Sequence, residues 1–79
     1  MARVRFFAQA RDATGVREAE LEGATVGEVL DAAVAAYGEL ANVLPISAIW
    51  VNGDRAARSD PVGVTDEVAV LPPVSGGGQ

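Results

Sequence analysis

One helix with strand-like segments on both sides is the feature that most restricts the fold of this chain. Six apolar positions share the spacing of one helix face: Val26, Val29, Leu30, Ala33, Val34 and Tyr37. Thr25 and Glu28 form a capping-box pattern, in which each side chain accepts the backbone N–H of the other residue. Gly38 stands where a left-handed residue often ends a helix. These positions predict a helix over 26–37.

Alternation between apolar and polar residues, which is typical of strands, precedes and follows this helix. We expect strands over residues 2–8, 16–22, 46–51, 55–58 and 67–71. A turn is predicted at 12–15, and Asn52-Gly53 favours a tight hairpin turn because both residues tolerate positive φ. Pro72-Pro73 ends the last strand, because proline has no N–H for a sheet hydrogen bond.

The order of these elements predicts an α+β domain. The first and last strands both carry long apolar patterns, so burying both in the centre of a mixed sheet, under the helix, is the economical arrangement. This is the β-grasp, or ubiquitin-like, fold, with one main helix packed across the sheet. We expect it to span residues 1–73, and residues 74–79 to form a flexible glycine-rich tail.

The residue types that are missing exclude most self-contained catalysis. The chain has no Lys, His or Cys, and its 6 basic residues are all Arg, against 11 Asp and Glu. It therefore lacks a Schiff-base amine, an imidazole base and a thiolate nucleophile. The net charge of −5 argues against nucleic acid, and no stretch reaches the ~18 apolar residues of a membrane span. We expect no metal site, no membrane partner and, without a secretory signal, a cytoplasmic protein.

Chemistry is expected at the C-terminal segment. Pro72 and Pro73 stiffen the exit from the sheet, and Gly76, Gly77 and Gly78 form a thread that a narrow slot can admit. A partner can hold such a backbone through strand-like hydrogen bonds and capture its carboxylate. A bare run of glycines is more often a frayed end, but the stiff proline pair argues against that interpretation.

Phe7 and Leu71 are predicted to form a docking patch at the root of the tail. Alternation puts Phe7 with Arg5 on the sheet face away from the helix. Leu71 shares that face if Val68 and Val70 lie under the helix. An ordinary exposed apolar pair is an equally good interpretation.

The other conspicuous side chains receive simpler interpretations. A solvated strand face is predicted for Glu18, Glu20 and Glu22. Trp50 is interpreted as a semi-buried sheet residue, and Arg11 and Arg55 as surface charges with a smaller chance of contacting a partner.

Four segments together resemble the MoaD branch of the MoaD/ThiS sulfur-carrier family, the small subunits of molybdopterin synthases. They are Phe-Phe-Ala-Gln-Ala-Arg at 6–11, Val-Asn-Gly at 51–53, Asp-Glu-Val at 66–68 and Leu-Pro-Pro-Val-Ser-Gly-Gly at 71–77. The resemblance covers nearly the whole chain. It rests on the combination of the first and last segments in one short sequence.

The resemblance implies that a C-terminal glycine is the functional group. In the family, a ubiquitin-activating-type adenylating enzyme uses ATP to convert this carboxylate to an acyl-adenylate, and a sulfurtransferase provides sulfur for a thiocarboxylate. The loaded tail enters the large synthase subunit and gives its sulfur to cyclic pyranopterin monophosphate, which builds the dithiolene of molybdopterin. No tightly bound cofactor is implied. The matching partner interface consists of Phe7, Leu71, Pro72, Pro73 and Val74.

Two residues extend past the family's terminal diglycine. Alignment on Pro-Pro-Val-Ser makes Gly77 the reactive residue, and alignment on the last glycine pair makes it Gly78. We expect Gln79, with or without Gly78, to be removed by a protease or to be an artefact of the recorded sequence. Three alternatives stay open: a sister carrier for thiazole, cysteine or tRNA thiolation, a ubiquitin-like protein modifier, and a domain with an inert tail.

Overall fold

A computed structural model describes residues 1–73, so the predicted tail at 74–79 lies outside the described part. The strands are β1 (Ala2–Phe6), β2 (Glu18–Leu21), β3 (Ala48–Val51), β4 (Asp54–Arg55) and β5 (Glu67–Leu71). The α-helices are α1 (Ala8–Thr14) and α2 (Val26–Ala36), and the 3-10 helices are η1 (Gly38–Asn42) and η2 (Leu44–Ile46).

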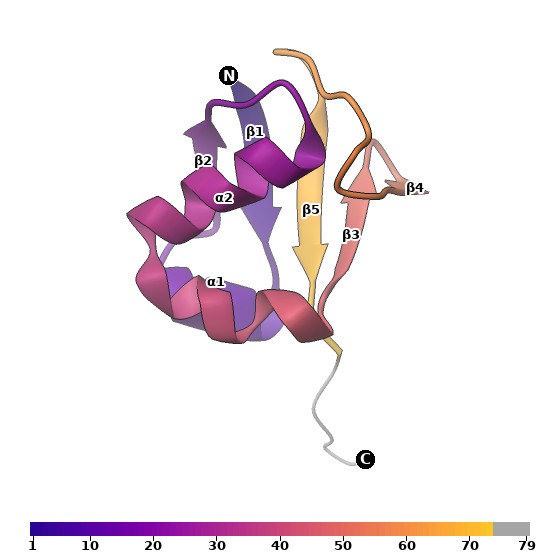
Figure 1. Cartoon of the computed structure of the whole chain (residues 1–79). Coiled ribbons are helices and arrows are strands. Elements are labelled where there is room, and N and C mark those ends of the chain that lie inside the picture. Colours follow the sequence, from indigo (N-terminus) through magenta and orange to yellow (C-terminus); the bar gives the residue numbers. More distant parts are fainter. Residues whose placement is uncertain (74–79) are drawn as a thin grey trace.

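The five strands form one mixed sheet in the order β2-β1-β5-β3-β4, and α2 crosses one face of it (Figure 1). β1 and β5 run parallel next to each other, while the other neighbouring pairs are antiparallel. The first and last strands therefore lie side by side within the sheet, as the apolar patterns predict. The β-grasp prediction is confirmed.

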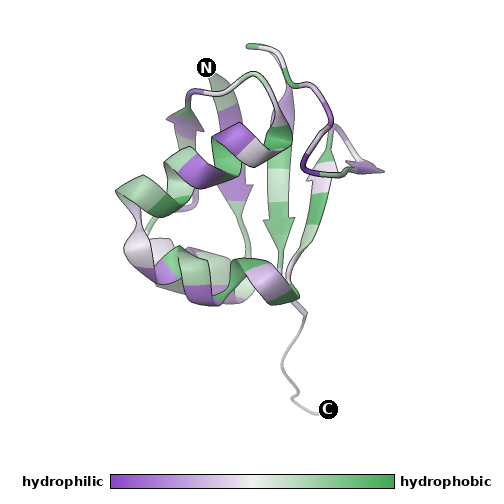
Figure 2. Ribbon diagram, viewed as in Figure 1, coloured by the Kyte–Doolittle hydropathy of each residue, from purple (hydrophilic) through white to green (hydrophobic). Residues whose placement is uncertain are grey.

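The core lies between the sheet and α2. Every second residue of β1 and β5 is buried there, and Figure 2 shows β5 as mainly hydrophobic. The sheet contributes Ala2, Val4, Phe6, Val68 and Val70, and α2 contributes Val26, Val29, Leu30 and Ala33. The rings of Phe6 and Tyr37 meet edge to face, with centroids 6.0 Å apart. None of the helices within residues 1–73 is long and apolar enough to cross a membrane.

The helix α1 is the main element that the sequence patterns miss. The first strand ends at Phe6 instead of residue 8, and the helix Ala8–Thr14 covers most of the turn predicted at 12–15. Gly15 ends the helix with a φ of +77°, which lets its N–H donate to the carbonyl of Arg11 at 2.8 Å. Because seven residues bury only Ala10, this helix has no apolar periodicity to detect.

The segment after α2 also differs from the prediction. Gly38 does not adopt a left-handed conformation; it begins η1, where a loop is predicted. The turn of η1 brings Leu40 into the core, where it has no exposed surface. Burial of this leucine explains why the chain keeps coiling tightly instead of leaving the helix through a left-handed glycine.

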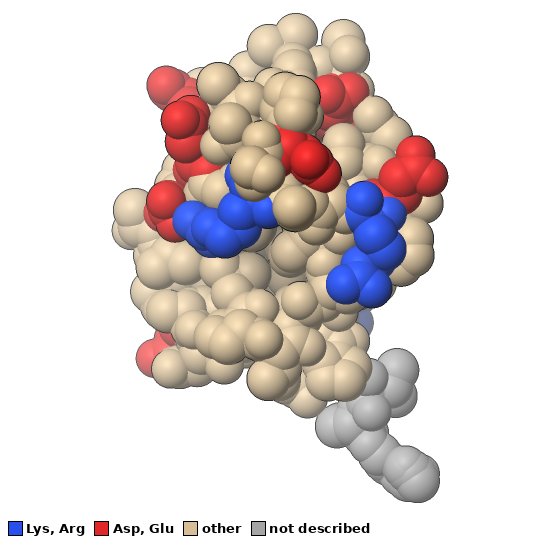
Figure 3. Space-filling view, turned by 45° about the vertical axis from the view of Figure 1, so that its right-hand side comes forward, with Lys and Arg blue, Asp and Glu red and all other residues tan. Residues whose placement is uncertain are grey.

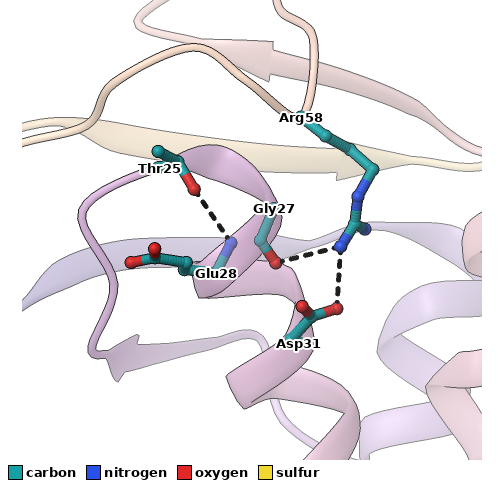
Figure 4. Close-up of polar contacts among 5 residues, drawn as sticks. All are labelled: Thr25, Gly27, Glu28, Asp31 and Arg58. Carbon is teal, nitrogen blue, oxygen red and sulfur yellow. Dashed lines mark hydrogen bonds and ion pairs between the residues drawn. The ribbon is translucent and has the colours of Figure 1, made fainter.

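The N-terminus of α2 carries the predicted cap with one change. The hydroxyl of Thr25 accepts the N–H of Glu28 at 3.2 Å (Figure 4). The Glu28 carboxylate reaches one residue further than predicted and accepts the N–H of Ala24 at 2.8 Å, not that of Thr25. Both interactions satisfy N–H groups near the helix start that have no intrahelical acceptor.

Arg58 ties the next loop to the same helix end. The return strand stops at Arg55 instead of covering 55–58, which frees Arg58 to point at α2. Its guanidinium donates to Asp31 at 2.8 Å and to the carbonyl of Gly27 at 3.3 Å (Figure 4). A Cβ on Gly27 would lie 3.2 Å from the backbone oxygen of Arg58, so the helix and loop backbones approach closely here. Figure 3 shows basic groups on this side of the molecule beside acidic ones, within a largely uncharged surface.

Candidate functional site

The sheet face opposite α2 is the candidate site. In β1 the residues that point away from α2 are exposed, and in β5 they are half-buried. The pairing of the strands puts three basic and three acidic side chains on this face: Arg3, Arg5, Arg55, Glu18, Glu20 and Glu67. Among these six paired residues the positive and negative charges balance, although the whole chain carries −5. A partner meeting this face encounters these balanced charges around an apolar centre.

Phe7 and Leu71 lie next to each other on this face. Phe7 continues β1 in an extended conformation, and its N–H donates to the carbonyl of Val70 at 3.2 Å. Phe6 pairs with Val70 in parallel register, so one step further puts Phe7 level with Leu71 on the face away from α2. Both side chains are half-buried. The adjacency expected from alternation is present, and the role of this pair in partner binding stays a prediction.

The backbone turns sharply directly after Phe7. Ala8 has a φ of +49°, in the left-handed region that costs an L-residue roughly 1–2 kcal/mol. The turn sends the chain from the sheet into α1, so Phe7 is the last side chain of this strand on the open face. A strained residue therefore adjoins the aromatic ring that we expect to contact a partner.

Arg5 covers part of the Phe7 ring. Its guanidinium carbon lies 5.4 Å from the ring centroid, which is cation–π geometry. The same group approaches the carboxylate of Glu67 at 4.0 Å, with 46% and 42% of the two side chains exposed. A long, exposed ion pair of this kind contributes at most ~1 kcal/mol, so Arg5 can exchange Glu67 for a partner's carboxylate at little cost.

The root of the tail is held on both sides. Leu71, the last residue of β5, pairs with Ala48 of β3, and β1 lies on the other side of β5. Pro72 is buried within the chain and anchors the exit, whereas Pro73 is exposed. The other predicted tail and interface residues lie outside the described residues: Val74, Gly76, Gly77 and Gly78.

Trp50 and Arg55 also belong to this face. The sequence predicts a semi-buried sheet residue and a surface charge, and the structure shows Trp50 half-buried and Arg55 exposed, but it does not predict that the two lie together. Trp50 pairs with Ala69 on one side and with Arg55 on the other. The guanidinium carbon of Arg55 lies 5.7 Å from the centroid of the Trp50 ring. The signal for this pair was present in the sequence, because a two-residue turn at 52–53 places residues 50 and 55 opposite each other.

The one described carboxyl whose pKa departs clearly from its ordinary value lies at the far end of β5. The N–H of Gly63 and the side-chain amide of Asn52 donate to Asp66 at 2.8 and 2.9 Å, and they lower its pKa. These bonds fasten the β3–β4 hairpin to the loop before β5. Within residues 1–73, no group of three or more His, Cys, Asp or Glu side chains is arranged to hold a metal ion.

Comparison with known proteins identifies the family of the chain and proteins of similar fold. Residues 4–77 match the family model described as the ThiS family. The molybdopterin synthase sulfur carrier subunit of Arabidopsis thaliana is 35% identical in an alignment 78 positions long, which covers 95% of this chain and 81% of that protein. The solved small archaeal modifier protein 1 (SAMP1) from Haloferax volcanii is 33% identical with a TM-score of 0.83, covering 96% and 98% of the two chains.

A solved protein–protein complex is also similar. It contains subunits 1 and 2 of the molybdopterin-converting factor from Helicobacter pylori 26695. The matching chain is 26% identical with a TM-score of 0.71, and the alignment covers 96% of this chain and 97% of that one.

Proposed function

Because the chain belongs to the ThiS family, we propose that it is the sulfur carrier subunit of a molybdopterin synthase. The reactive group is the carboxylate of Gly77, after removal of the residues beyond it. Its partners are a ubiquitin-activating-type adenylating enzyme, a sulfurtransferase and the large synthase subunit. The identity with the Arabidopsis thaliana sulfur carrier subunit supports this role.

The proposed chemistry needs no acid, base or nucleophilic side chain from this chain. A carboxylate oxygen attacks the α-phosphorus of ATP in the adenylating enzyme, and pyrophosphate leaves. Sulfur at the sulfide level then attacks the carbonyl carbon, AMP leaves, and an anionic thiocarboxylate remains. The absence of Lys, His and Cys is compatible with this sequence of steps, because the partners provide every proton transfer and phosphate contact.

One observation carries the proposal: the Phe7–Leu71 pair lies at the root of the tail. A partner that binds this pair fixes the point from which the tail starts, because Leu71 ends a strand paired on both sides. From Pro73, the four residues up to Gly77 can span at most about 14 Å. Docking at the patch therefore restricts how deep the terminal glycine can reach, which is what delivery of a reactive group to a remote active site requires.

Mass spectrometry tests the carrier role. A chain ending at Gly77 is incubated with ATP, the adenylating enzyme of the same organism and a sulfur source. We expect a mass increase equal to the replacement of one oxygen by one sulfur. The matched control ends at Ser75 and should gain no mass, and the chain ending at Gln79 shows whether trimming is required. An unmodified Gly77-ended chain, with an adenylating enzyme active on another carrier, would refute the proposal.

A second function, covalent modification of other proteins, is favoured by the likeness to SAMP1. The same activated glycine would then be transferred to a lysine amine of a target, and AMP would leave as the isopeptide bond forms. Isopeptide-linked tail remnants on cellular proteins would support this function.

A sulfur carrier for another thiolation pathway would instead form the same thiocarboxylate. With the large synthase subunit, however, it would give no dithiolene product.

A further inference from the structure

We propose that Trp50 and Arg55 form a second docking point on the open face, and that it binds a carboxylate of the partner protein that accepts the tail. This inference rests on the proposed function, since it concerns the same partner. It concerns the β3–β4 side of the sheet, away from the Phe7–Leu71 pair. Two observations carry it: the geometry of the residue row that crosses the sheet, and the charges along that row.

The row runs across all five strands. Strand pairing places its members level with one another in the order Glu18, Arg5, Ala69, Trp50 and Arg55. The β1 side holds an arginine over an aromatic ring, at 5.4 Å between Arg5 and Phe7. The β3–β4 side repeats this arrangement, at 5.7 Å between Arg55 and Trp50. Ala69, with its small side chain, lies between these two arginine–aromatic pairs. The open face therefore presents two rings, each covered by a guanidinium, on either side of a shallow apolar centre.

The charges differ between the two sides. Arg5 has Glu18 opposite it and Glu67 at 4.0 Å. No ion pair within 4.0 Å joins Arg55 to a carboxylate of residues 1–73. A guanidinium that lies over a ring keeps its planar set of N–H donors, and a carboxylate can accept two of them in parallel. Arg55 is exposed and Trp50 is half-buried, so the donors are accessible and the ring shields one side of the guanidinium from water.

These features describe the partner surface. Trp and Arg are the residue types that most often dominate the energy of a protein interface. Three strand spacings separate Arg5 from Arg55, or about 14 Å at ~4.8 Å each. The complementary surface is an apolar ridge that contacts Leu71 and Ala69, with an acidic residue on each side at about that separation. Because Arg55 forms no ion pair with a carboxylate of residues 1–73, the acidic residue on the β4 side is the more important of the two.

Binding of the full chain to the large subunit of molybdopterin synthase from the same organism tests the proposal. Calorimetry at low and at high salt would compare the unchanged chain with Arg55→Met, which keeps an apolar stem on Trp50 and removes the charge. We expect about tenfold weaker binding, as for an interface residue of more than 1 kcal/mol, and a smaller loss of affinity with added salt. Arg55→Lys should be intermediate, because it keeps the charge but loses the planar donors.

Matched variants make the outcome decisive. Arg17→Met removes the same charge from an exposed residue outside the row and should bind like the unchanged chain. Thermal unfolding checks that each variant is folded. If Leu71→Ala weakens binding while Arg55→Met has unchanged affinity and salt dependence, the second docking point is refuted and the proposed function stands. If neither the full chain nor the chain ending at Gly77 binds the large subunit, both the proposed function and this inference are refuted.

Discussion

Phe6 and Phe7 are neighbours of the same type on opposite faces of one strand, so truncating each to alanine separates folding from docking. Phe6 is 2% exposed and packs against Tyr37 in the core. Phe7 is half-buried, and its contact with Arg5 is a cation–π contact at the surface. The two substitutions remove the same atoms, and only their surroundings differ.

The expected magnitudes are far apart. Replacing a fully buried phenylalanine by alanine costs about 3–5 kcal/mol, and a single core of this size rarely contributes more than ~3–5 kcal/mol in total. Phe6→Ala should therefore unfold most of the protein at 25 °C. Phe7→Ala loses a partial burial and a surface cation–π contact of roughly 0.5–1 kcal/mol, so it should stay folded with a lower midpoint of urea unfolding.

Phe7→Ala, which should have the smaller effect on folding, should strongly weaken binding to the partner. As a central interface residue, Phe7 should contribute about 1–3 kcal/mol to partner binding, a 5- to 150-fold change in Kd. Circular dichroism during urea titration measures the folding effect, and calorimetry with the large synthase subunit measures the binding effect. The reasoning fails if Phe7→Ala unfolds as readily as Phe6→Ala, or if folded Phe7→Ala binds with unchanged affinity.

Three further predictions concern the fold. Ala8→Gly should stabilise the protein by roughly 1 kcal/mol despite glycine's poor helix propensity, because the left-handed strain at φ +49° disappears; a lower urea midpoint would contradict this. Gly27→Ala should raise the unfolding rate and lower the thermal midpoint, because the added Cβ would lie only 3.2 Å from the backbone oxygen of Arg58. An unchanged midpoint and unfolding rate would show that the loop at Arg58 moves aside without cost. The hydrogen bonds to Asp66 lower its pKa in the folded state, so their stabilisation is complete above the ordinary aspartate pKa of ~3.9 and is lost as the pH falls through the lower folded value. The urea midpoints of the unchanged chain and of Asp66→Asn should accordingly differ at pH 7 and converge at the acid end, and a constant difference would argue against the assignment.

Long-range pairing was predictable because it depends on apolar patterns that extend over whole strands. The last strand has its expected bounds, Glu67–Leu71, because Asp66 and Pro72 bracket a short apolar run. β1 and β5 both have such patterns, so both are expected in the centre of the sheet. Burying both under one helix puts them next to each other, and they pair in parallel. The alternation within each strand then decides which side chains reach the open face.

Short elements were not predictable from the same patterns. The helix α1 begins with Ala8 in a left-handed conformation, which is normally adopted by glycine. The helix also buries only Ala10, so it has no apolar periodicity. The predicted left-handed Gly38 instead continues into η1, because the burial of Leu40 outweighs the local preference at a helix end. In both segments tertiary packing overrides local signals, and packing is not visible in a window of a few residues.

The two halves of the candidate site differ in the same way. Phe7 and Leu71 could be placed together because each lies one residue beyond a core position in a central strand. Trp50 and Arg55 required the register of the β3–β4 hairpin, which depends on the turn alone. Asn52 and Gly53 both have positive φ, +51° and +89°, and a two-residue turn of this kind sets residue 50 opposite residue 55. A longer turn would shift the return strand by one residue and move the arginine to the other face of the sheet. The Asn-Gly dipeptide therefore does more than reverse the chain, because it decides that the open face carries a second arginine over an aromatic ring.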